Sequence, residues 1–578
     1  MIVPMKHVTV VCTAAEGTKA LETLRRLECI HVDLSAAASP DWAAAKGELA
    51  DAEKAVRLLE QAARETRVRP GTPPSCRPDD SLEAVRKEHL AAAVLKADET
   101  RAGLTEQAEA LQTTVRLYEP FGDFDPALAT QIRQAGVPVV LAQGPGLPPA
   151  RKVFFETPLP EGWVEIPLPA ERLAETQKRL AQTQARIASI TAALAAAYAR
   201  ADVITDCYPG LKDRVLFAAA QDALTTQGAV SYLEGWIPSD AVPRLRAQAV
   251  THAWGMMLRD PKADETPPTL IRPPKWCRPV MVLFEGLGIS PGYSESDVSV
   301  PFLCYFTLFF AMLVGDAGYG TLILALTLFG WRKTRPREAG RHRPVLVRSW
   351  LTLLTVFSLA TIAWGTLSNA WFGMGLPFAG DWPTVKWLAD PSYNNMMQLC
   401  FAIGVSHLML ARIWNGICQI NRLTCLVEFG WAGVLLFMYF VVLAIVGIAP
   451  AVPGWSYGLF GVSLAMIVSK TRGIDLGMLP LNVMGAMGDI ISYVRLFAVG
   501  YASLQVAQNF NAMAVGLNLP LWAKTVPMIL ILLVGHGINF MLAGLAILVH
   551  AVRLNTLEFS NHKGMTWSGY AFNPFRKH

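Results

Sequence analysis

The sequence predicts a mixed fold. It has an N-terminal elongated α/β cytoplasmic domain with a long antiparallel coiled coil (residues 1–275) and a C-terminal all-α membrane domain (residues 276–578). Residues 1–270 carry 30 Lys and Arg and 35 Asp and Glu, whereas residues 271–578 carry 21 and 11. The mean hydropathy of the whole chain, +0.32, is high for a soluble protein. The charge-poor second half is therefore expected to lie in a lipid bilayer, and the net charge of +5 gives no sign of nucleic-acid binding.

The N-terminal domain opens with a predicted strand, helix and strand. Residues 6–13 are β-branched and apolar, 15–28 have helical periodicity, and 29–34 return to a strand pattern. Three long tracts rich in Ala, Leu and charged residues follow, at 41–68, 80–118 and 169–205, with a short β-rich island before the third. These tracts predict the antiparallel coiled coil, and solvated helices in an ordinary α/β domain are the alternative.

The chain carries no recognisable catalytic motif. The phosphate-loop pattern G-x-x-x-x-G-K-[ST] is absent from the sequence, as are H-E-x-x-H and G-x-S-x-G. The nine cysteines form no C-x-x-C pair, which argues against a zinc site or a disulfide framework. We therefore expect no nucleotide site, no cofactor and no metal in this chain.

The C-terminal domain is predicted to contain eight membrane-spanning helices. The apolar tracts are 299–315, 317–331, 346–372, 394–411, 427–449, 455–469, 477–517 and 523–552. The first two are separated at GDAGYG because one continuous helix would be too long, and Asp316 is expected to cap the second helix rather than to bind an ion. The strongly basic segment 332–348 must be cytoplasmic, and eight spans then place both termini in the cytoplasm.

Arg495 is the most informative ionisable residue, because an intramembrane Arg costs about 2.5–3.5 kcal/mol on insertion scales. It lies deep in the seventh tract. On a helical wheel it shares a small, polar face with Ser492, Gln505 and Asn509. An Arg paired with Asp489 for packing is the alternative interpretation.

The eighth span, drawn as a helix over residues 535–559, places a second group of polar residues, Asn539, His550 and Arg553, on one side. His550 as an interfacial histidine and Arg553 as a positive-inside anchor remain open alternatives. The seventh and eighth helices would be roughly 60 Å and 50 Å long against a hydrocarbon core of about 30 Å. We therefore expect two long, strongly tilted helices.

Four segments resemble the membrane stator subunit of V-type and archaeal-type rotary ATPases, called subunit a or subunit I. They are YLEGWIPSDAVPRL (232–245), PFLCYFTLFFAMLVGDAGYG (301–320), GDIISYVRLFAVG (488–500) and HAVRLNTLEFSNHKG (550–564). The resemblance covers almost the whole chain. The N-terminal domain is similar to that of the shorter, bacterial or archaeal form of the subunit. The resemblance implies a non-catalytic, ion-translocating subunit in the cytoplasmic membrane of a bacterium or archaeon.

The resemblance also implies roles for individual residues. Arg495 would be the essential stator charge and Arg553 the second arginine. The residues expected to line two aqueous half-channels are Ser492, Gln505, Asn509, Asn539 and His550. The implied partners are a proteolipid rotor ring, peripheral stalk subunits, the central-stalk connector of the rotor, and membrane lipid. A proton is the expected ion, with sodium left open.

Two positions depart from the eukaryotic pattern, in which a Glu precedes the second Arg by ten residues and a His follows the first Arg by eight. This chain has Ala543 and Ser503 there. Two other classes of protein fit the sequence less well. A secondary ion transporter would show inverted repeats, which the sequence lacks. A membrane-anchored scaffold with a coiled-coil cytoplasmic domain would not explain a deep Arg on a polar face.

Overall fold

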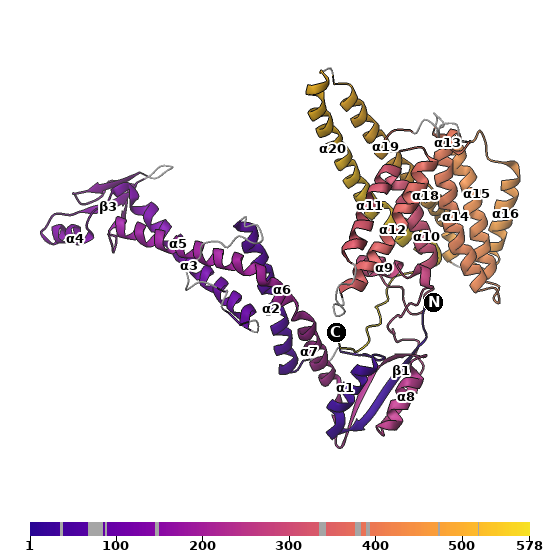
Figure 1. Ribbon diagram of the computed structural model, residues 1–578, viewed down its shortest axis with the longest axis horizontal. Helices are drawn as coiled ribbons and strands as arrows, with labels where there is room; N and C mark the ends of the chain where they lie inside the picture. The colour runs from indigo at the N-terminus through magenta and orange to yellow at the C-terminus, as the bar shows by residue number, and fades with distance from the viewer. Residues whose placement is uncertain are drawn as a thin grey trace. The chain divides into compact units, whose positions relative to one another are not determined.

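The computed structural model describes residues 1–34, 38–66, 82, 85–86, 89–144, 150–334, 343–375, 383–388, 393–471, 474–517 and 520–577. The chain divides into two compact units. The N-terminal unit comprises residues 7–259 and 574–578, and the C-terminal unit comprises residues 1–6 and 260–573. Helices dominate the chain, and two sheets lie in its N-terminal region (Figure 1).

The larger sheet has the strand order β2-β7-β1-β8, with β6 beside β7. The strands are β1 (Met5–Thr13), β2 (His31–Val32), β6 (Thr225–Gln227), β7 (Val230–Pro238) and β8 (Gly255–Arg259). The helices beside it are α1 (Gly17–Leu27) and α8 (Val242–Thr251). The apolar stripe of α1, formed by Ala20, Leu21 and Leu24, packs in one core with Val10 and Ile237 of the sheet. The expected opening of strand, helix and strand corresponds to β1, α1 and β2.

Long helices form the middle of the N-terminal unit. They are α2 (Pro40–Glu65), α3 (Leu90–Tyr118), α5 (Leu173–Ala197), α6 (Ala201–Thr205) and α7 (Tyr208–Ala223). α3 packs against α5, and α2 packs against α3, α5 and α7. Small and large apolar side chains, including Ala55, Leu59, Val94 and Leu194, fill the space between them. The second helix begins at Leu90 rather than near residue 80, and the break between the first and second tracts, residues 69–80, lies outside the described residues.

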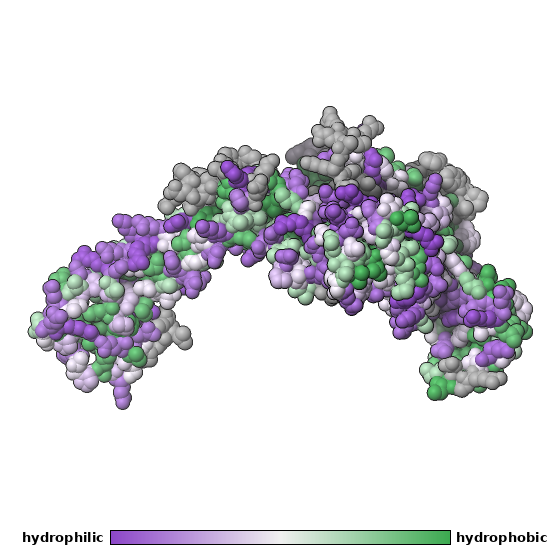
Figure 2. Space-filling model, turned by 90° about the horizontal axis from the view of Figure 1, so that it is seen from below, coloured by the Kyte–Doolittle hydropathy of each residue, from purple (hydrophilic) through white to green (hydrophobic). Residues whose placement is uncertain are grey.

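A smaller sheet follows α3, with the order β4-β3-β5. Its strands are β3 (Val140–Gln143), β4 (Arg151–Phe154) and β5 (Val164–Ile166), preceded by α4 (Pro126–Gln134). The β-rich island was expected, whereas α4 was not. Leu128, Phe155 and Val164 of this lobe are exposed. Figure 2 shows apolar side chains among hydrophilic ones on the lobe at its left.

The C-terminal unit is a bundle of helices. They are α9 (Val280–Leu287), α10 (Ser299–Val314), α11 (Ala317–Lys333), α12 (Arg343–Leu367), α13 (Pro383–Leu388), α14 (Asn394–Cys418), α15 (Cys425–Ile445), α16 (Gly454–Val468), α17 (Ile474–Gly477), α18 (Leu479–Ile491), α19 (Val494–Val515), α20 (Leu521–Ala546) and α21 (Ser560–Lys563). Two π-helical segments, Ile547–Ala551 and Leu554–Phe559, join α20 to α21. α19 and α20 lie side by side (Figure 1).

Among the described residues, six helices are long and apolar enough to cross a membrane. Five belong to the C-terminal unit, and the sixth, Leu173–Thr205, is the Ala-rich tract that contains α5. α10 and α11 form a pair bent by 118°. α16 is apolar but shorter than the six candidate spans. A helix therefore lies in each predicted apolar tract, but the span count of eight stays a prediction. The basic residues 335–342, on which the orientation depends, lie outside the described residues.

The end of the chain supplies a core residue to the N-terminal unit. Phe575 is 5% exposed, stacks on Phe217, and donates its backbone N–H to the carbonyl of Ile30 at 2.7 Å. Cys29 lies in the same core, where burial raises the pKa of its thiol to about 11. Burial and the small thiolate fraction should both make Cys29 slow to react.

We expect Phe575→Ala to destabilise the N-terminal unit by about 3–5 kcal/mol, because it empties a buried aromatic site. The alkylation of Cys29 in the intact chain should become faster. Its rate can be followed by mass spectrometry of the peptide that contains Cys29. Lys577→Ala is the matched control, since that side chain is exposed. Equal alkylation rates in the two variants would show that Phe575 does not hold this core closed.

Candidate functional site

Arg495 follows a break between two helices. α18 ends at Ile491 and α19 begins at Val494, so Ser492 and Tyr493 form a turn. Across the break, the N–H of Leu496 bonds to the carbonyl of Tyr493 at 3.1 Å, a three-residue spacing that is tighter than that of an α-helix. The seventh tract was expected to be one continuous helix, and this interruption directly precedes the arginine.

Arg495 and Arg553 share one carboxylate. Nη2 of Arg495 and Nε of Arg553 each lie 3.3 Å from Oε1 of Glu558. The Glu558 side chain is 5% exposed, whereas those of Arg495 and Arg553 are 23% and 53% exposed. Oε2 of Glu558 has no hydrogen-bond partner among the described residues. Two guanidinium groups and one carboxylate leave this cluster with a net charge of +1.

The π-helical geometry explains how Arg553 and Glu558 meet. Residues five apart lie on different faces of an α-helix, but a π-helix brings them together because its hydrogen bonds join residues five apart. Glu558 lies in the segment Leu554–Phe559, directly after Arg553. Sequence reasoning missed Glu558 as a functional residue, although it belongs to the motif that carries the second arginine. Asp489, the alternative partner considered for Arg495, instead accepts a hydrogen bond from Nε2 of His562 at 2.9 Å.

The other predicted site residues lie in different surroundings. Ser492 is half-buried, and its hydroxyl donates to the carbonyl of Gly488 at 3.1 Å. Asn509 is exposed, and Nδ1 of His550 is buried without a partner among the described residues. Gln505 lines a cavity between helices.

Asn539 belongs to a buried polar network between α11, α19 and α20. Its amide donates to the hydroxyl of Tyr319 at 3.0 Å and to the carbonyl of Ser503 at 2.9 Å, and its oxygen accepts from the hydroxyl of Ser503 at 3.1 Å. The hydroxyl of Tyr319 contacts Nδ1 of His536 at 2.7 Å, and Nε2 of His536 contacts the amide oxygen of Asn511 at 3.1 Å. Asn539 thus holds helices together, away from the ion pairs of Glu558.

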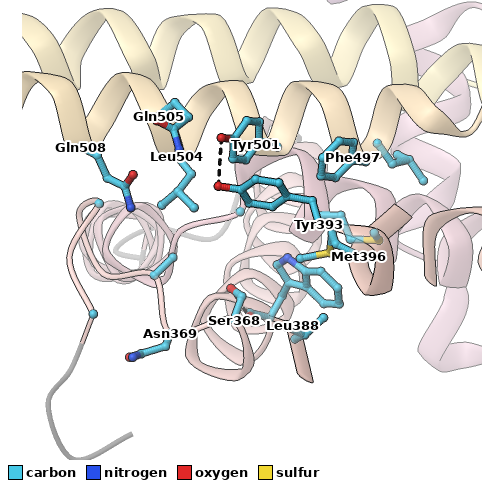
Figure 3. A pocket seen from close by; sticks show the side chains of 18 of the residues that line it. Ser368, Asn369, Leu388, Tyr393, Met396, Phe497, Tyr501, Leu504, Gln505 and Gln508 are labelled. Atoms are coloured by element: carbon cyan, nitrogen blue, oxygen red, sulfur yellow. Dashed lines mark hydrogen bonds between the residues drawn. The ribbon is translucent and has the colours of Figure 1, made fainter. Parts of the chain in front are cut away.

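The cavity has a volume of about 360 Å³. Residues 368–375, α14 and α19 contribute most of its lining. Figure 3 shows Tyr501, Leu504 and Gln508 extending from α19 toward the facing segments. The hydroxyl of Tyr501 donates to that of Tyr393 at 3.0 Å. Leu496 and Phe497, which directly follow Arg495, also line the cavity, so it reaches the neighbourhood of the arginine.

A second polar cluster lies at the ends of α14, α15, α18 and α21. His562, bonded to Asp489, accepts a hydrogen bond from Nε of Arg412 at 3.2 Å. Arg412 pairs with Glu428 at 3.2 Å. Because Nδ1 of His562 accepts, the proton of a neutral ring lies on Nε2. Among the described residues, no group of three or more His, Cys, Asp or Glu could hold a metal ion.

No family model matches the chain. A V-type ATP synthase subunit I from Borreliella burgdorferi is 31% identical over 378 residues, which cover 60% of this chain and 60% of that protein. The V-type ATP synthase subunit I 1 of Treponema pallidum is 28% identical over 644 aligned positions that cover both chains completely. An A-type ATP synthase subunit I of Methanocaldococcus jannaschii is 27% identical over 390 residues, covering 60% of this chain and 55% of that protein. The chain is a multi-pass membrane protein that is similar over its whole length to a V-type ATP synthase subunit I, and over more than half of its length to an A-type ATP synthase subunit I.

Proposed function

We propose that this chain is the stator subunit of the membrane sector of a V/A-type rotary ATPase. In this proposal it carries Arg495 against a rotor ring of small proteolipids and provides two half-channels for ions. The observation that carries the proposal is the cluster of Arg495, Arg553 and Glu558, two guanidinium groups held by one buried carboxylate within long apolar helices. A cluster with one uncompensated positive charge in a membrane is costly, and such charges usually serve ion movement.

The chemistry follows from the properties of guanidinium. Its pKa is too high for deprotonation in a protein, so a rotor carboxylate that meets Arg495 must be ionised and must have released its ion. Glu558 already balances one of the two guanidinium charges, and an arriving rotor carboxylate would balance the other. The fixed charge also opposes a direct leak of cations between the two half-channels.

The cavity beside α19 is the proposed half-channel on the non-cytoplasmic side. It lies at the C-terminal end of α12 and the N-terminal end of α14, far along the chain from the basic residues expected in the cytoplasm. Gln505 and Gln508 supply polar groups that can hydrate an ion. The opposite half-channel would run past Ser492 and the pair of Asp489 and His562 toward Arg495.

The assignment of the cavity as a half-channel can be tested with Gln508→Cys, introduced into a variant without the native cysteines. A membrane-impermeant thiol reagent should label this cysteine from the non-cytoplasmic side, because the side chain is exposed and lines the cavity that would be the water-filled half-channel. Ala514→Cys is the control and should remain unlabelled, since residue 514 is 1% exposed. Labelling of Gln508→Cys only from the cytoplasmic side would overturn the assignment.

The remaining parts of the proposal concern topology and partners. Eight spans with both termini cytoplasmic would place the N-terminal unit in the cytoplasm, where α2, α3 and α5 would act as an antiparallel coiled coil. This unit would bind peripheral stalks, and the exposed side chains of Leu128, Phe155 and Val164 offer apolar surface for them. The proteolipid ring, the central-stalk connector and lipid complete the partners, in the cytoplasmic membrane of a bacterium or archaeon.

Purification of the tagged chain from its own membranes tests the assignment as a whole. We expect a small proteolipid and soluble ATPase subunits to co-purify, and ATP-driven cation uptake after reconstitution into vesicles. Proton uptake, measured with a pH-sensitive dye, is the expected activity, and a requirement for sodium would change the ion. A chain that purifies without any proteolipid would contradict the stator assignment.

A further inference from the structure

We propose that His407, in the middle of α14, is a positioning residue that holds both partners of the Arg495–Glu558 ion pair. The inference rests on the proposed function, because it concerns the geometry of the same charge cluster. His407 is 0% exposed. Its hydrogen bond goes to Tyr493, not to Arg495 or Glu558. His407 acts instead through the neighbours of each, Tyr493 on one side and Phe559 on the other.

Tyr493 links His407 to the arginine. It lies in the turn between α18 and α19, two residues before Arg495, and is 0% exposed. Its hydroxyl contacts Nδ1 of His407 at 2.9 Å. Its ring covers Gly404, one helical turn before His407, and a Cβ atom at Gly404 would collide with that ring. The turn that starts α19 is therefore fixed against α14 by the close packing on Gly404 and by the hydrogen bond to His407.

Phe559 links His407 to the carboxylate. Its ring stacks on the imidazole with centroids 4.5 Å apart and an interplanar angle of 13°. On its other face, the imidazole stacks on Tyr305 at 4.0 Å and 24°. Phe559 is the residue after Glu558, so the stacked rings fix the position of the π-helical segment that carries the carboxylate. One imidazole thus contacts the chain immediately beside each partner of the ion pair.

Apolar packing alone does not account for an imidazole at this position. Nε2 of His407 is buried without a hydrogen-bond partner among the described residues, which a phenylalanine ring would avoid. The imidazole offers one feature that phenylalanine lacks, a hydrogen bond to Tyr493. We infer that this bond compensates for the unpaired nitrogen by fixing the turn before Arg495.

The test compares His407→Phe, Tyr493→Phe and the double variant in the reconstituted complex. Each single variant should lower the ratio of cations transported to ATP hydrolysed roughly three- to tenfold, as expected for the loss of one hydrogen bond. The double variant should be no worse than the poorer single variant, because no polar group is then left unpaired. Tyr439→Phe, which removes a hydroxyl from α15, should leave the ratio unchanged.

Three outcomes separate the possibilities. If Arg495→Ala retains uptake in the same assay, the proposed function fails. If Arg495→Ala abolishes uptake but Tyr493→Phe keeps the full ratio, only the role of His407 fails. If the losses of the two single variants multiply in the double variant, the two side chains act independently and the inference is overturned. Should His407→Phe fail to assemble, Tyr493→Phe decides alone, since it removes one oxygen and keeps the ring packing.

Discussion

Arg495→Ala should abolish ATP-driven cation uptake while leaving the complex assembled. The substitution removes the charge that forces a rotor carboxylate to be ionised, and it leaves Glu558 with Arg553 alone. A rotor carboxylate could then pass residue 495 in its neutral form. Rotation of the ring would no longer be coupled to the release of ions. Uptake into vesicles and ATP hydrolysis should be measured on the same preparation. Uptake above about half of the wild-type rate would rule out Arg495 as the essential stator charge.

Two further variants act as matched comparisons for Arg495→Ala. Arg495→Lys keeps a positive charge but should also fail, because a desolvated ammonium can lose its proton and lacks the planar fork of guanidinium. Arg553→Ala should have a weaker effect, since its side chain is 53% exposed and Arg495 still holds Glu558. An equal loss in Arg553→Ala would mean that the two arginines form one functional unit.

Helical periodicity predicted most of the elements and placed Arg495 on a polar face, but it did not predict the partner of that residue. The helical wheels treat residues 487–514 and 535–559 as uniform α-helix. The structure breaks the first helix at Ser492 and Tyr493 and winds part of the second into π-helix. Glu558 meets Arg553 only in that π-helical geometry. A wheel drawn at the α-helical angle therefore separates the two residues that the fold joins.

The cavity could not be predicted for a different reason. Its lining comes from segments far apart in the sequence, including residues 368–375, Tyr393 and Gln508. Periodicity reports which face of one helix is polar, and it says nothing of how a loop folds against another helix. Gln505 was found because it lies on the polar face of the seventh tract. The same argument placed Asn539 on the side of the eighth helix that carries Arg553, but it did not predict that tertiary packing buries Asn539 against Tyr319 and Ser503.

Asp316 holds the loop that forms one wall of this cavity. It is 4% exposed and accepts hydrogen bonds from four backbone N–H groups. Two come from Gly318 and Tyr319, at the start of α11, at 2.7 and 3.3 Å. The other two come from Phe372 and Gly373, both at 2.8 Å. The carboxylate is thus held like an anion at a helix N-terminus and in a backbone nest. The sequence correctly predicted the cap of α11 but gave no sign of the contact with the loop.

Asp316→Ala should destabilise the C-terminal unit by roughly 4 kcal/mol or more, taking about 1 kcal/mol at the low end for each buried donor left unpaired. Phe372 and Gly373 have φ of 50° and 74°. A phenylalanine in this left-handed region is strained by about 1–2 kcal/mol, so the loop should leave this conformation once the carboxylate is gone. We expect a lower yield of assembled complex, a lower thermal midpoint, and altered labelling of Gln508→Cys in the fraction that assembles. Asp264→Ala, at an exposed position, is the control. An Asp316→Ala complex with the midpoint and labelling rate of the control would show that the cavity wall stands without this carboxylate.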